Sequence, residues 1–373
     1  MKRTYAEINL NTLRNNIQKI RGLVGQNVKL MGVVKADGYG HGAVNVSKVL
    51  EEEGADYLGV AWAEEGIELR ENNIKLPILV LSEQDDNIIP EIVNNDLSQT
   101  VYTLNFAKKL SEYCKKNNKT IKIHIKLDTG MGRVGVQLYD AEELVSKVRN
   151  LPNLKIEGIF THFSKADEKE DNYTLEQLRL FKEKAEYIKK NIIDIPLVHA
   201  ANSSAAENFP ETHLDMARIG IALYKNVLKF KTKVAYIKEV DEGVSIGYGG
   251  TYVTKNRTKI ATIPAGYADG YNRLLSNNSD VLINGKKYHV VGRVSMDMIT
   301  VDIGLNCDVK LGDDVVLIGE DNGNIISAEE IAKRCSTIDY EILCSIGKRV
   351  PRYFVEEKKT GCVYSSAIGI KKN

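Results

Sequence analysis

Short apolar and β-branched runs alternate with helical patterns from residue 27 to about residue 220. Apolar residues recur at three- and four-residue spacing between the runs, which predicts helices at Gly42–Glu53, Glu64–Glu71, Leu104–Cys114, Ala141–Arg149 and Leu175–Lys189. The runs themselves, which we expect to be strands, are Val28–Val34, Tyr57–Ala61, Ile78–Leu81, Gln99–Thr103, Ile121–Leu127, Ile156–Thr161, Leu197–His199 and Leu214–Arg218. Most of these eight runs precede a helix, and the series has no reversal point. The pattern therefore favours a parallel (β/α)8 TIM-type barrel over an open doubly wound sheet.

The pattern changes after about residue 230, where strand-like runs are separated by glycine and Asp-Asn-Gly turns. One helical segment, Ala328–Cys335, interrupts runs at Thr232–Val240, Thr258–Ile263, Val281–Ile283, Lys287–Val291, Ile299–Ile303 and Asp314–Ile318. This spacing is typical of a mainly-β domain. We therefore expect an α/β barrel domain over 1–231 and a mainly-β domain over 232–373, with the first ~10 residues able to pair with the latter.

Composition narrows the functional classes. The 373 residues suit two domains, and 51 basic against 50 acidic residues give a net charge of +1, which indicates no nucleic-acid partner and no anionic membrane surface. No signal peptide is evident, and no apolar run approaches the ~18 residues of a membrane-spanning helix. The cysteines are odd in number, far apart and without CxxC spacing: Cys114, Cys307, Cys335, Cys344 and Cys362. A cytoplasmic protein without a disulfide framework is expected.

Catalytic residues of a barrel lie at the C-terminal ends of its strands. The first strand ends at Lys35, which precedes a glycine-rich turn. This lysine is either a Schiff-base nucleophile or a solvated side chain before an ordinary turn. On the fifth strand, period-two alternation places Lys122, His124 and Lys126 on one face. Such a face either lines a polar site or is exposed, because unpaired charges inside a barrel are costly.

The next segment, Gly130–Gly135, matches GxGxxG, and Glu157 follows about 20 residues later, as in a dinucleotide fingerprint. We disfavour that interpretation because the motif follows the fifth strand of the series. The alternatives are a tight turn that needs glycine, or a loop that places Arg133 over the barrel mouth.

The last three strands end in further polar residues. These are His162, then Asn202 and Ser203, then Arg218 with Gly220. The serine either caps a helix or helps to hold a phosphate. No HExxH or carboxylate cluster is present, so we expect no metal site.

Taken together in order along the chain, these segments resemble the alanine racemase family, pyridoxal-phosphate enzymes with a barrel and a β domain. The motifs that carry the resemblance are Val34–Gly42, Lys126–Gly135, Ala201–Ser203, Gly266–Gly270, Gly292–Asp297 and Arg349–Arg352. Any one of them is weak evidence, whereas six in register are specific.

The resemblance implies that Lys35 holds pyridoxal 5′-phosphate as an internal aldimine. The positions that match the family's phosphate ligands are Tyr39, Ser203, Gly220, Ile221 and Tyr340. Arg218 matches an arginine that faces the pyridine nitrogen. Because a guanidinium cannot protonate that nitrogen, we infer that the ring is a weaker electron sink and that proton exchange is favoured over transamination.

The resemblance also implies two bases, Lys35 on one face of the substrate Cα and Tyr267, from the second subunit of a homodimer, on the other. Arg218 and His162 match a hydrogen-bonded relay that supports the tyrosine. Arg133 matches a contact to the cofactor phenolate and the substrate carboxylate. The backbone N–H of Met296 matches a second contact to that carboxylate. Lys126 matches a lysine that is often carbamylated.

The expected activity is therefore L-/D-alanine racemisation through an external aldimine, which supplies D-alanine for peptidoglycan. The main alternative is a serine or broad-specificity racemase, followed by a related decarboxylase and a non-catalytic pyridoxal-phosphate carrier. Two residues depart from the family pattern: Lys225 in Leu-Tyr-Lys and Ser295 before Met296. We expect these departures to affect the kinetic constants and not the type of reaction.

Overall fold

The computed structural model describes residues 3–358 and 361–366. The chain forms two compact units that are not contiguous in sequence. The barrel unit consists of Arg14–Gly38 and Gly42–Leu223. The β unit consists of Met1–Leu13, Tyr39–His41 and Tyr224–Asn373.

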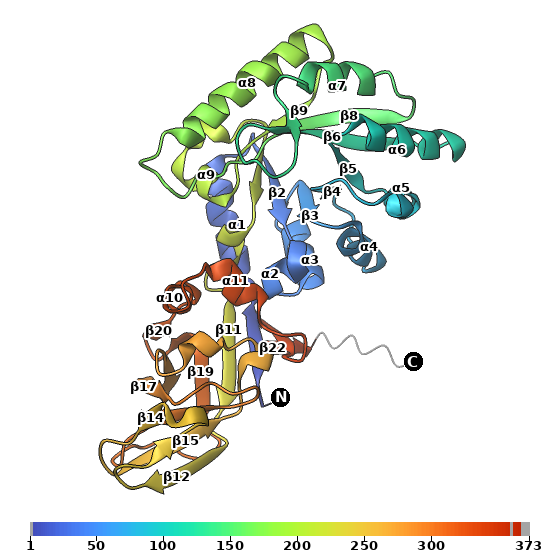
Figure 1. The fold of residues 1–373 in the computed structure, drawn as a ribbon. Helices are drawn as coiled ribbons and strands as arrows, with labels where there is room; N and C mark the ends of the chain where they lie inside the picture. Colours follow the sequence, from blue (N-terminus) through green and yellow to red (C-terminus); the bar gives the residue numbers. More distant parts are fainter. Residues whose placement is uncertain (1–2, 359–360, 367–373) are drawn as a thin grey trace. The chain divides into compact units, whose positions relative to one another are not determined.

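The barrel unit is built on parallel strands in the order β10-β2-β3-β4-β5-β6-β8-β9 (Figure 1). Their bounds are β2 (Lys29–Val33), β3 (Tyr57–Val60), β4 (Ile78–Val80), β5 (Ser98–Val101), β6 (Ile121–Asp128), β8 (Leu154–Phe160), β9 (Leu197–His199) and β10 (Met216–Ile219). The short β7 (Val136–Gln137) pairs with β6. Arg218 N–H donates to Ala201 O at 3.0 Å beyond the end of β9, so the sheet nearly closes on itself. The predicted (β/α)8 barrel is confirmed.

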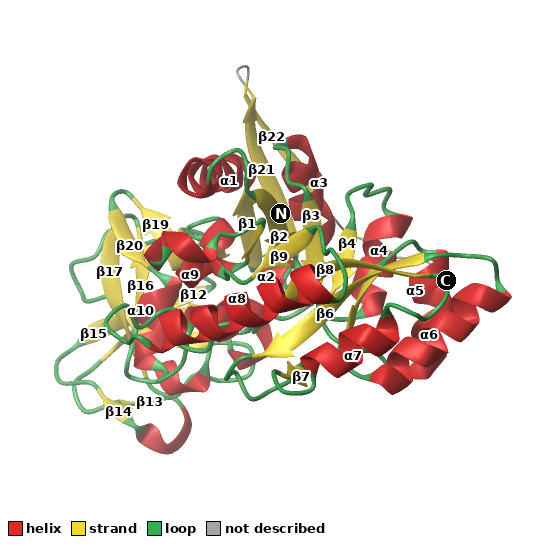
Figure 2. Cartoon of the chain, turned by 90° about the horizontal axis from the view of Figure 1, so that it is seen from above, coloured by secondary structure: helices red, strands yellow, loops and turns green. Residues whose placement is uncertain are grey.

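Helices follow most of these strands and surround them (Figure 2). Their bounds are α1 (Leu10–Val24), α2 (Lys35–Gly40), α3 (Ala43–Glu52), α4 (Ala63–Glu71), α5 (Ile89–Asn94), α6 (Leu104–Lys116), α7 (Ala141–Val148), α8 (Tyr173–Asn191) and α9 (Ser203–Asn208). The helix α6 illustrates why these segments form helices. Thr103 caps its first turn by accepting the N–H of Phe106, and Phe106, Leu110 and Cys114 are buried at helical spacing. The helices α1, α2 and α5 are additions to the sequence-based expectation.

The β unit contains one large sheet in the order β12-β15-β18-β17-β16-β19-β11-β1-β21-β22, with β20 beside β19. The bounds are β1 (Tyr5–Asn9), β11 (Leu228–Lys233), β12 (Tyr236–Val240), β15 (Thr258–Ile263), β16 (Asp280–Ile283), β17 (Lys286–Val291), β18 (Ile299–Asp302), β19 (Asp314–Asp321), β20 (Asn324–Ile326), β21 (Arg352–Lys358) and β22 (Gly361–Ser366). A separate hairpin joins β13 (Ser245–Ile246) to β14 (Tyr252–Val253), and the unit also holds α10 (Ala328–Arg334) and α11 (Asp339–Cys344).

The region expected as one strand at Thr232–Val240 forms two. The chain leaves β11, which pairs with β1 and β19, and continues as β12, which pairs only with β15 within the described sheet. Val234 N–H donates to Asp313 O and Ala235 N–H to Thr262 O, both at 2.9 Å. The backbone therefore changes its hydrogen-bonding partner between Val234 and Ala235, from the segment before β19 to strand β15. The alternation of apolar residues does not reveal such a change of partner.

Two further properties bear on function. Within residues 3–358 and 361–366, no helix is both long and apolar enough to cross a membrane. Among the described side chains, Cys114, Cys307, Cys335 and Cys344 form no disulfide, whereas the side chain of Cys362 lies outside the part of the chain that is described.

Candidate active site

Lys35 begins a left-handed turn directly after β2. The φ angles from Ala36 to Gly40 are 52°, 54°, 60°, 54° and 80°, so α2 is a turn of the opposite hand to an ordinary helix. Each non-glycine residue in this conformation costs roughly 1–2 kcal/mol. Hydrogen bonds offset the cost: Gly38 N–H donates to Val34 O at 2.8 Å, and Ala36 N–H to Glu65 Oε1 at 2.6 Å. The strained backbone fixes the point at which Lys35 leaves the strand.

The predicted phosphate ligands Tyr39 and Tyr340 are neighbours within the β unit. Their ring centroids are 5.8 Å apart, and the ring of Tyr39 also packs against Tyr224 at 4.9 Å. Arg352 Nε donates to the carbonyl of Gly40 at 3.0 Å and so ties the end of the turn to the Arg349–Arg352 motif. The assignment of both tyrosines to a phosphate stays a prediction.

Cationic side chains gather around Lys126 at the C-terminal end of β6. Lys126 is only 6% exposed, and burial lowers its pKa to about 8, an effect to which nearby positive charges add. Those charges belong to Arg218, Arg133 and Lys35. Among the principal causes of the pKa shift, only the negative charge of Asp128 acts to raise the pKa of Lys126. Lys126 and Arg218 are buried, Lys35 is half-buried and Arg133 is exposed, so this end of the barrel offers several positive charges to an anionic ligand.

Arg218 on β10 is 4% exposed and is held by acceptors that directly follow the ends of β8 and β9. The two N–H groups of its Nη2 are shared among three acceptors: Thr161 O at 2.7 Å, Ala200 O at 3.0 Å and His162 Nδ1 at 3.2 Å. Burial lowers the pKa of Arg218 to about 9, which still leaves it cationic at neutral pH. Burial and the surrounding cations hold the pKa of His162 well below its ordinary value, so His162 is neutral.

The loop between β6 and β7 explains the GxGxxG pattern. Gly130, Gly132 and Gly135 have φ angles of 127°, 68° and 133°. Asp128 Oδ1 accepts the N–H groups of Gly130 at 2.9 Å and Gly132 at 3.1 Å. A Cβ on Gly135 would lie 2.8 Å from Asp128 N. The pattern is therefore a tight turn that leads to Arg133, and the dinucleotide interpretation is wrong for this barrel.

Ser203 lies where β9 and β10 end. Asn202, the residue before α9, caps that helix through Ala205 N–H at 2.9 Å. The Ser203 hydroxyl accepts Gly220 N–H at 2.9 Å and Ala222 N–H at 3.4 Å, on either side of Ile221. The predicted residues Ser203, Gly220 and Ile221 therefore lie together, with a hydroxyl and a row of backbone N–H groups.

Tyr267 and Met296 lie side by side in the β unit. Tyr267 N–H donates to Ser295 O at 3.1 Å, and Ala268 N–H to Met296 O at 3.0 Å. A Cβ on Gly266 would lie 2.3 Å from Ser295 O, so this close backbone approach needs glycine. Both side chains are exposed, Tyr267 by 44% and Met296 by 53%.

Arg349 joins three of the sequence motifs. Its guanidinium donates to both oxygens of Asp269, at 2.7 and 2.9 Å, and to Asp297 Oδ1 at 2.8 Å. Asp269 Oδ2 also accepts Gly266 N–H at 3.0 Å, which shapes the Tyr267 turn from within. The role of Arg349 in joining these segments could not be predicted from its motif alone.

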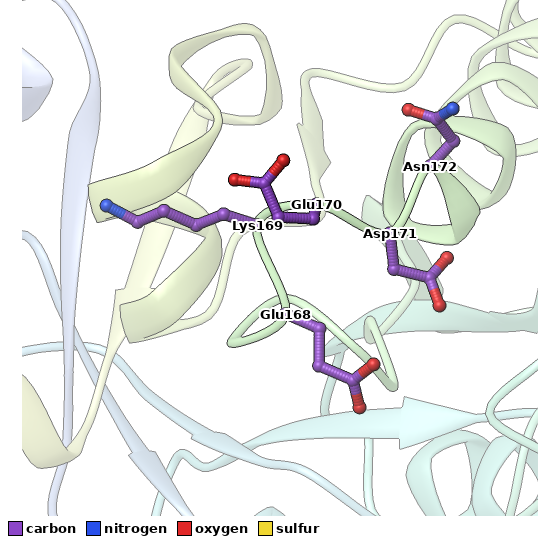
Figure 3. A pocket seen from close by; sticks show the side chains of 5 residues that line it. All are labelled: Glu168, Lys169, Glu170, Asp171 and Asn172. Atoms are coloured by element: carbon purple, nitrogen blue, oxygen red, sulfur yellow. The ribbon is translucent and has the colours of Figure 1, made fainter.

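A hollow elsewhere on the barrel unit contains no predicted site residue. It lies on the loop between β8 and α8, where carboxylates and a lysine side chain project from neighbouring positions (Figure 3). Its lining is Glu168, Lys169, Glu170, Asp171 and Asn172. Within the described residues, no group of three or more His, Cys, Asp or Glu side chains could hold a metal ion.

Three polar residues lie behind Arg218, and the sequence did not predict that they contact it or one another. His199 Nδ1 accepts from Arg218 Nη1 at 3.1 Å, and His124 and Glu157 lie behind it. The signal that was available is their polarity: each is a titratable residue in a strand expected to be buried.

Comparison with known proteins places both units in one family. A family model for the alanine racemase N-terminal domain matches residues 8–226, and one for the C-terminal domain matches 227–354. An alanine racemase of Halothermothrix orenii is 47% identical over 365 residues, which cover 94% of this chain and 96% of that protein. One of Methanococcus maripaludis is 41% identical and covers 94% and 98%.

Solved structures agree with the sequence comparison. The alanine racemase of Clostridium difficile 630 superposes with a TM-score of 0.93 at 40% identity and covers 99% of both chains. That of Bacillus anthracis, with bound L-Ala-P, gives 0.91 at 36% identity and covers 98% of both. The chain therefore belongs to the alanine racemase family.

Proposed function

We propose that this chain is an alanine racemase that uses pyridoxal 5′-phosphate, works as a homodimer in the cytoplasm and supplies D-alanine for peptidoglycan. The observation that carries the proposal is the group of cationic side chains around Lys126 at the barrel mouth, where Lys126 and Arg218 are both buried and both lie over the ring of Phe160. Family membership supports the reaction, and the L-Ala-P bound to the Bacillus anthracis relative supports an alanine-like substrate.

The residues at the mouth fit the chemical groups of the cofactor. The Ser203 hydroxyl, whose oxygen accepts the N–H groups of Gly220 and Ala222 and whose own O–H can donate, suits the phosphate, and the predicted residues Gly220 and Ile221 lie beside it. Arg133 suits the phenolate oxygen, and Lys35 suits the aldehyde as an amine at the end of a strand. Arg218 suits the ring nitrogen, to which it would donate a hydrogen bond and keep its proton.

The proton chemistry falls to two groups. Bound pyridoxal phosphate supplies an electron sink that makes the Cα proton of alanine acidic. Lys35 Nζ would remove or return that proton on one face, and Tyr267 Oη of the second subunit on the other. Arg218 only donates, so His162 accepts at Nδ1 and carries its proton on Nε2, from which it can support the tyrosine oxygen.

The substrate carboxylate needs donors of its own. Arg133 supplies a guanidinium, and Met296 supplies a backbone N–H. Because the backbones of Ala268 and Met296 are hydrogen-bonded, Met296 would enter a partner's site together with Tyr267.

Lys126 has a pKa that suits carbamylation. With a pKa of about 8, a sizeable fraction of its amine is neutral at physiological pH. A neutral amine adds to carbon dioxide with loss of one proton and becomes a carbamate anion. The product would place a negative charge beside Arg133 and relieve the crowding of cations.

The test is to assay the purified protein with L-alanine in deuterated water. We expect D-alanine to form with solvent deuterium at Cα, together with a visible absorbance band from bound cofactor. Lys35→Ala should lose both the band and at least about 100-fold of the activity, whereas Lys116→Ala, on the exposed end of α6, should retain both. Cofactor binding without exchange would indicate a carrier, and a higher kcat/KM for serine would indicate a serine racemase.

A further inference from the structure

Arg218 is the end of a chain of buried polar side chains that runs through the inside of the barrel. Arg218 Nη1 lies 3.1 Å from His199 Nδ1, and His199 Nε2 lies 2.9 Å from His124 Nδ1. His124 Nε2 lies 3.4 Å from Glu157 Oε2. We call Glu157, His124, His199 and Arg218 the histidine chain. Both imidazoles are fully buried, and Glu157 is 8% exposed.

The two ends of the histidine chain determine where every proton lies. A guanidinium only donates, so His199 must accept at Nδ1 and carry its proton on Nε2. That proton is donated to His124 Nδ1, so His124 also carries its proton on Nε2. The latter proton is donated to Glu157, an ionised carboxylate that only accepts. All three hydrogen bonds therefore point from Arg218 towards Glu157, and both histidines are neutral.

The electrostatic environment agrees with this assignment. Burial and the charge of Arg218 hold the pKa of His199 well below its ordinary value, and burial lowers the pKa of His124. Burial raises the pKa of Glu157, but hydrogen bonds from His124 and Lys122 outweigh it and hold the pKa at about 2. Lys122 Nζ lies 2.8 Å from the other oxygen, Glu157 Oε1, and is 45% exposed.

An irregularity in the backbone of β8 helps to hold the histidine chain in place. The pairing of β6 with β8 shifts register between Ile123 and His124, so that His124 faces Gly158 and Glu157 is an extra residue. Glu157 and Phe160 are an odd number of residues apart, yet Glu157 reaches His124 and Phe160 stacks on His199, with ring centroids 4.8 Å apart. The irregularity therefore allows both side chains to reach the interior.

Gly158 is the second adaptation. A Cβ at this position would lie 2.2 Å from His124 Nδ1, the atom that accepts from His199. Only glycine leaves room for that imidazole in its present position. The bulge and the glycine both serve the same hydrogen bond.

We propose that Glu157, His124 and His199 are positioning residues that fix the orientation of Arg218 and keep its partner imidazole an acceptor. Arg218 uses both N–H groups of Nη2 and one N–H of Nη1 for its hydrogen bonds to described residues, so Nε–H and the second N–H of Nη1 can serve a ligand. Resting on the proposed function, the ligand atom is the pyridine nitrogen of the cofactor. The histidine chain thus fixes Arg218 as the hydrogen-bond donor to that nitrogen. Because the neighbouring imidazole stays neutral, a protonated imidazole cannot take the place of the guanidinium.

The clearest variant is Glu157→Gln, which keeps the shape and adds a donor. Glutamine can donate to His124 Nε2 and so permits the reversed chain, in which His199 carries its proton on Nδ1. That proton would then face the N–H of Arg218, a contact between two donors. We therefore expect the orientation of Arg218 to be lost although no residue of the site has changed.

The first readout is NMR of the enzyme with isotope-labelled histidine, whose ring signals report the tautomer. Only six histidines are present in the sequence. In the wild type we expect His124 and His199 to be neutral and protonated on Nε2. In Glu157→Gln we expect a mixture of tautomers. This readout needs no cofactor chemistry, so it tests the inference even if the proposed function fails.

The second readout is the partition between racemisation and abortive transamination of alanine to pyruvate. Glu157→Gln and Gly158→Ala should lower the kcat of racemisation about 10- to 100-fold, with less change in KM. They should also raise the pyruvate formed per racemisation turnover, because a displaced Arg218 no longer keeps the ring nitrogen unprotonated. A purely structural defect would lower both reactions together.

Lys122→Gln is the matched control, because it removes another partner of Glu157, whose carboxylate also interacts with Tyr57, and leaves the histidine chain intact. It should keep the wild-type tautomers and the wild-type partition. Wild-type tautomers and partition in Glu157→Gln, or an equal effect of Lys122→Gln, would overturn the inference. If Gly158→Ala does not fold, Glu157→Gln decides. If the wild type does not racemise alanine, the proposed function fails and the NMR result alone decides the inference.

Discussion

Lys126 is a residue whose protonation costs the folded protein stability. Its pKa is lowered from 10.5 to about 8, first by burial and then by neighbouring cations. Between these two values the unfolded chain holds the proton and the folded chain does not. The contribution of Lys126 to the free energy of unfolding is therefore lowest below pH 8 and rises as the pH increases towards 10.5.

We expect this rise to be measurable in the cofactor-free protein with bicarbonate excluded. The lowered pKa sets an upper limit of roughly 3 kcal/mol for its size. Lys126→Met should be more stable than the wild type below pH 8 and should lose much of the rise. Urea unfolding across this pH range measures it, with the exposed Lys116→Met as control. A wild-type pH dependence in Lys126→Met would show that the buried amine is not the cause.

Single residues also show what sequence patterns can and cannot reveal about the site. Alternation correctly placed Lys122, His124 and Lys126 on one face of β6, because a strand has a period of two. It could not show that Glu157 pairs with them, because β8 contains the register shift opposite His124. Glu157 was therefore connected by spacing to the wrong motif, GxGxxG, and only tertiary pairing gives its partners.

Among the elements, the left-handed turn after β2 was the least predictable from the local sequence pattern. The glycines between Lys35 and Gly42 predicted a turn. They did not predict that the non-glycine residues Ala36, Asp37 and Tyr39 also have positive φ angles. Surrounding structure maintains this conformation against its intrinsic cost. Asp37 is the residue that links the turn to the next helix, since its Oδ1 accepts Ala43 N–H at 2.8 Å, at the start of α3.

Replacing Asp37 therefore tests the stability of the element. Asp37→Ala removes the acceptor for Ala43 N–H and puts a residue with no compensating hydrogen bond at positive φ. We expect a loss of about 1–2 kcal/mol in the free energy of unfolding. Asp37→Asn, which keeps an acceptor and tolerates positive φ, should lose much less. Equal losses in both variants, measured by urea unfolding, would assign the effect to the charge of Asp37.

Elements with a clear local pattern were predictable, whereas the register between distant partners was not. The barrel strands and α6 follow from periodicity within a few residues. By contrast, β1 belongs to the first ten residues, which were expected to be able to pair with the β domain, but its two neighbours β11 and β21 and its register, with Ala6 opposite both Phe230 and Arg352, could not be predicted. Pairings over such sequence separations depend on tertiary context, and the split of β11 from β12 has the same origin.

On the scale of the whole molecule, the division into units does not follow the order of the chain. Residues 1–13 and 39–41 belong to the β unit, although barrel residues lie between and after them. The turn after Lys35 is thus the place where the chain leaves the barrel unit and returns to it at Gly42. The left-handed backbone that positions Lys35 coincides with this crossing.

The last prediction concerns the assembly of two chains. Tyr267 and Met296 are both exposed in a single chain, which suits residues that serve the site of a second copy. If they do, a chain with Lys35→Ala and a chain with Tyr267→Phe should each form an inactive homodimer. A heterodimer of the two has one site with both defects and one site with neither. It should regain about half of the wild-type activity, since one of the two symmetric sites is intact.

Co-expression with two different affinity tags isolates that heterodimer for an alanine racemisation assay. The matched control combines Lys35→Ala with a chain that carries both substitutions, because that heterodimer has no intact site. Activity in the first heterodimer and none in the control would require Tyr267 to act across the subunit interface. If the heterodimer is as inactive as its parents, or if isolated monomers are active, then Tyr267 serves its own chain or none. The exposure of Tyr267 and Met296 would in that case need another explanation, and the two-base scheme would have to be built within one subunit.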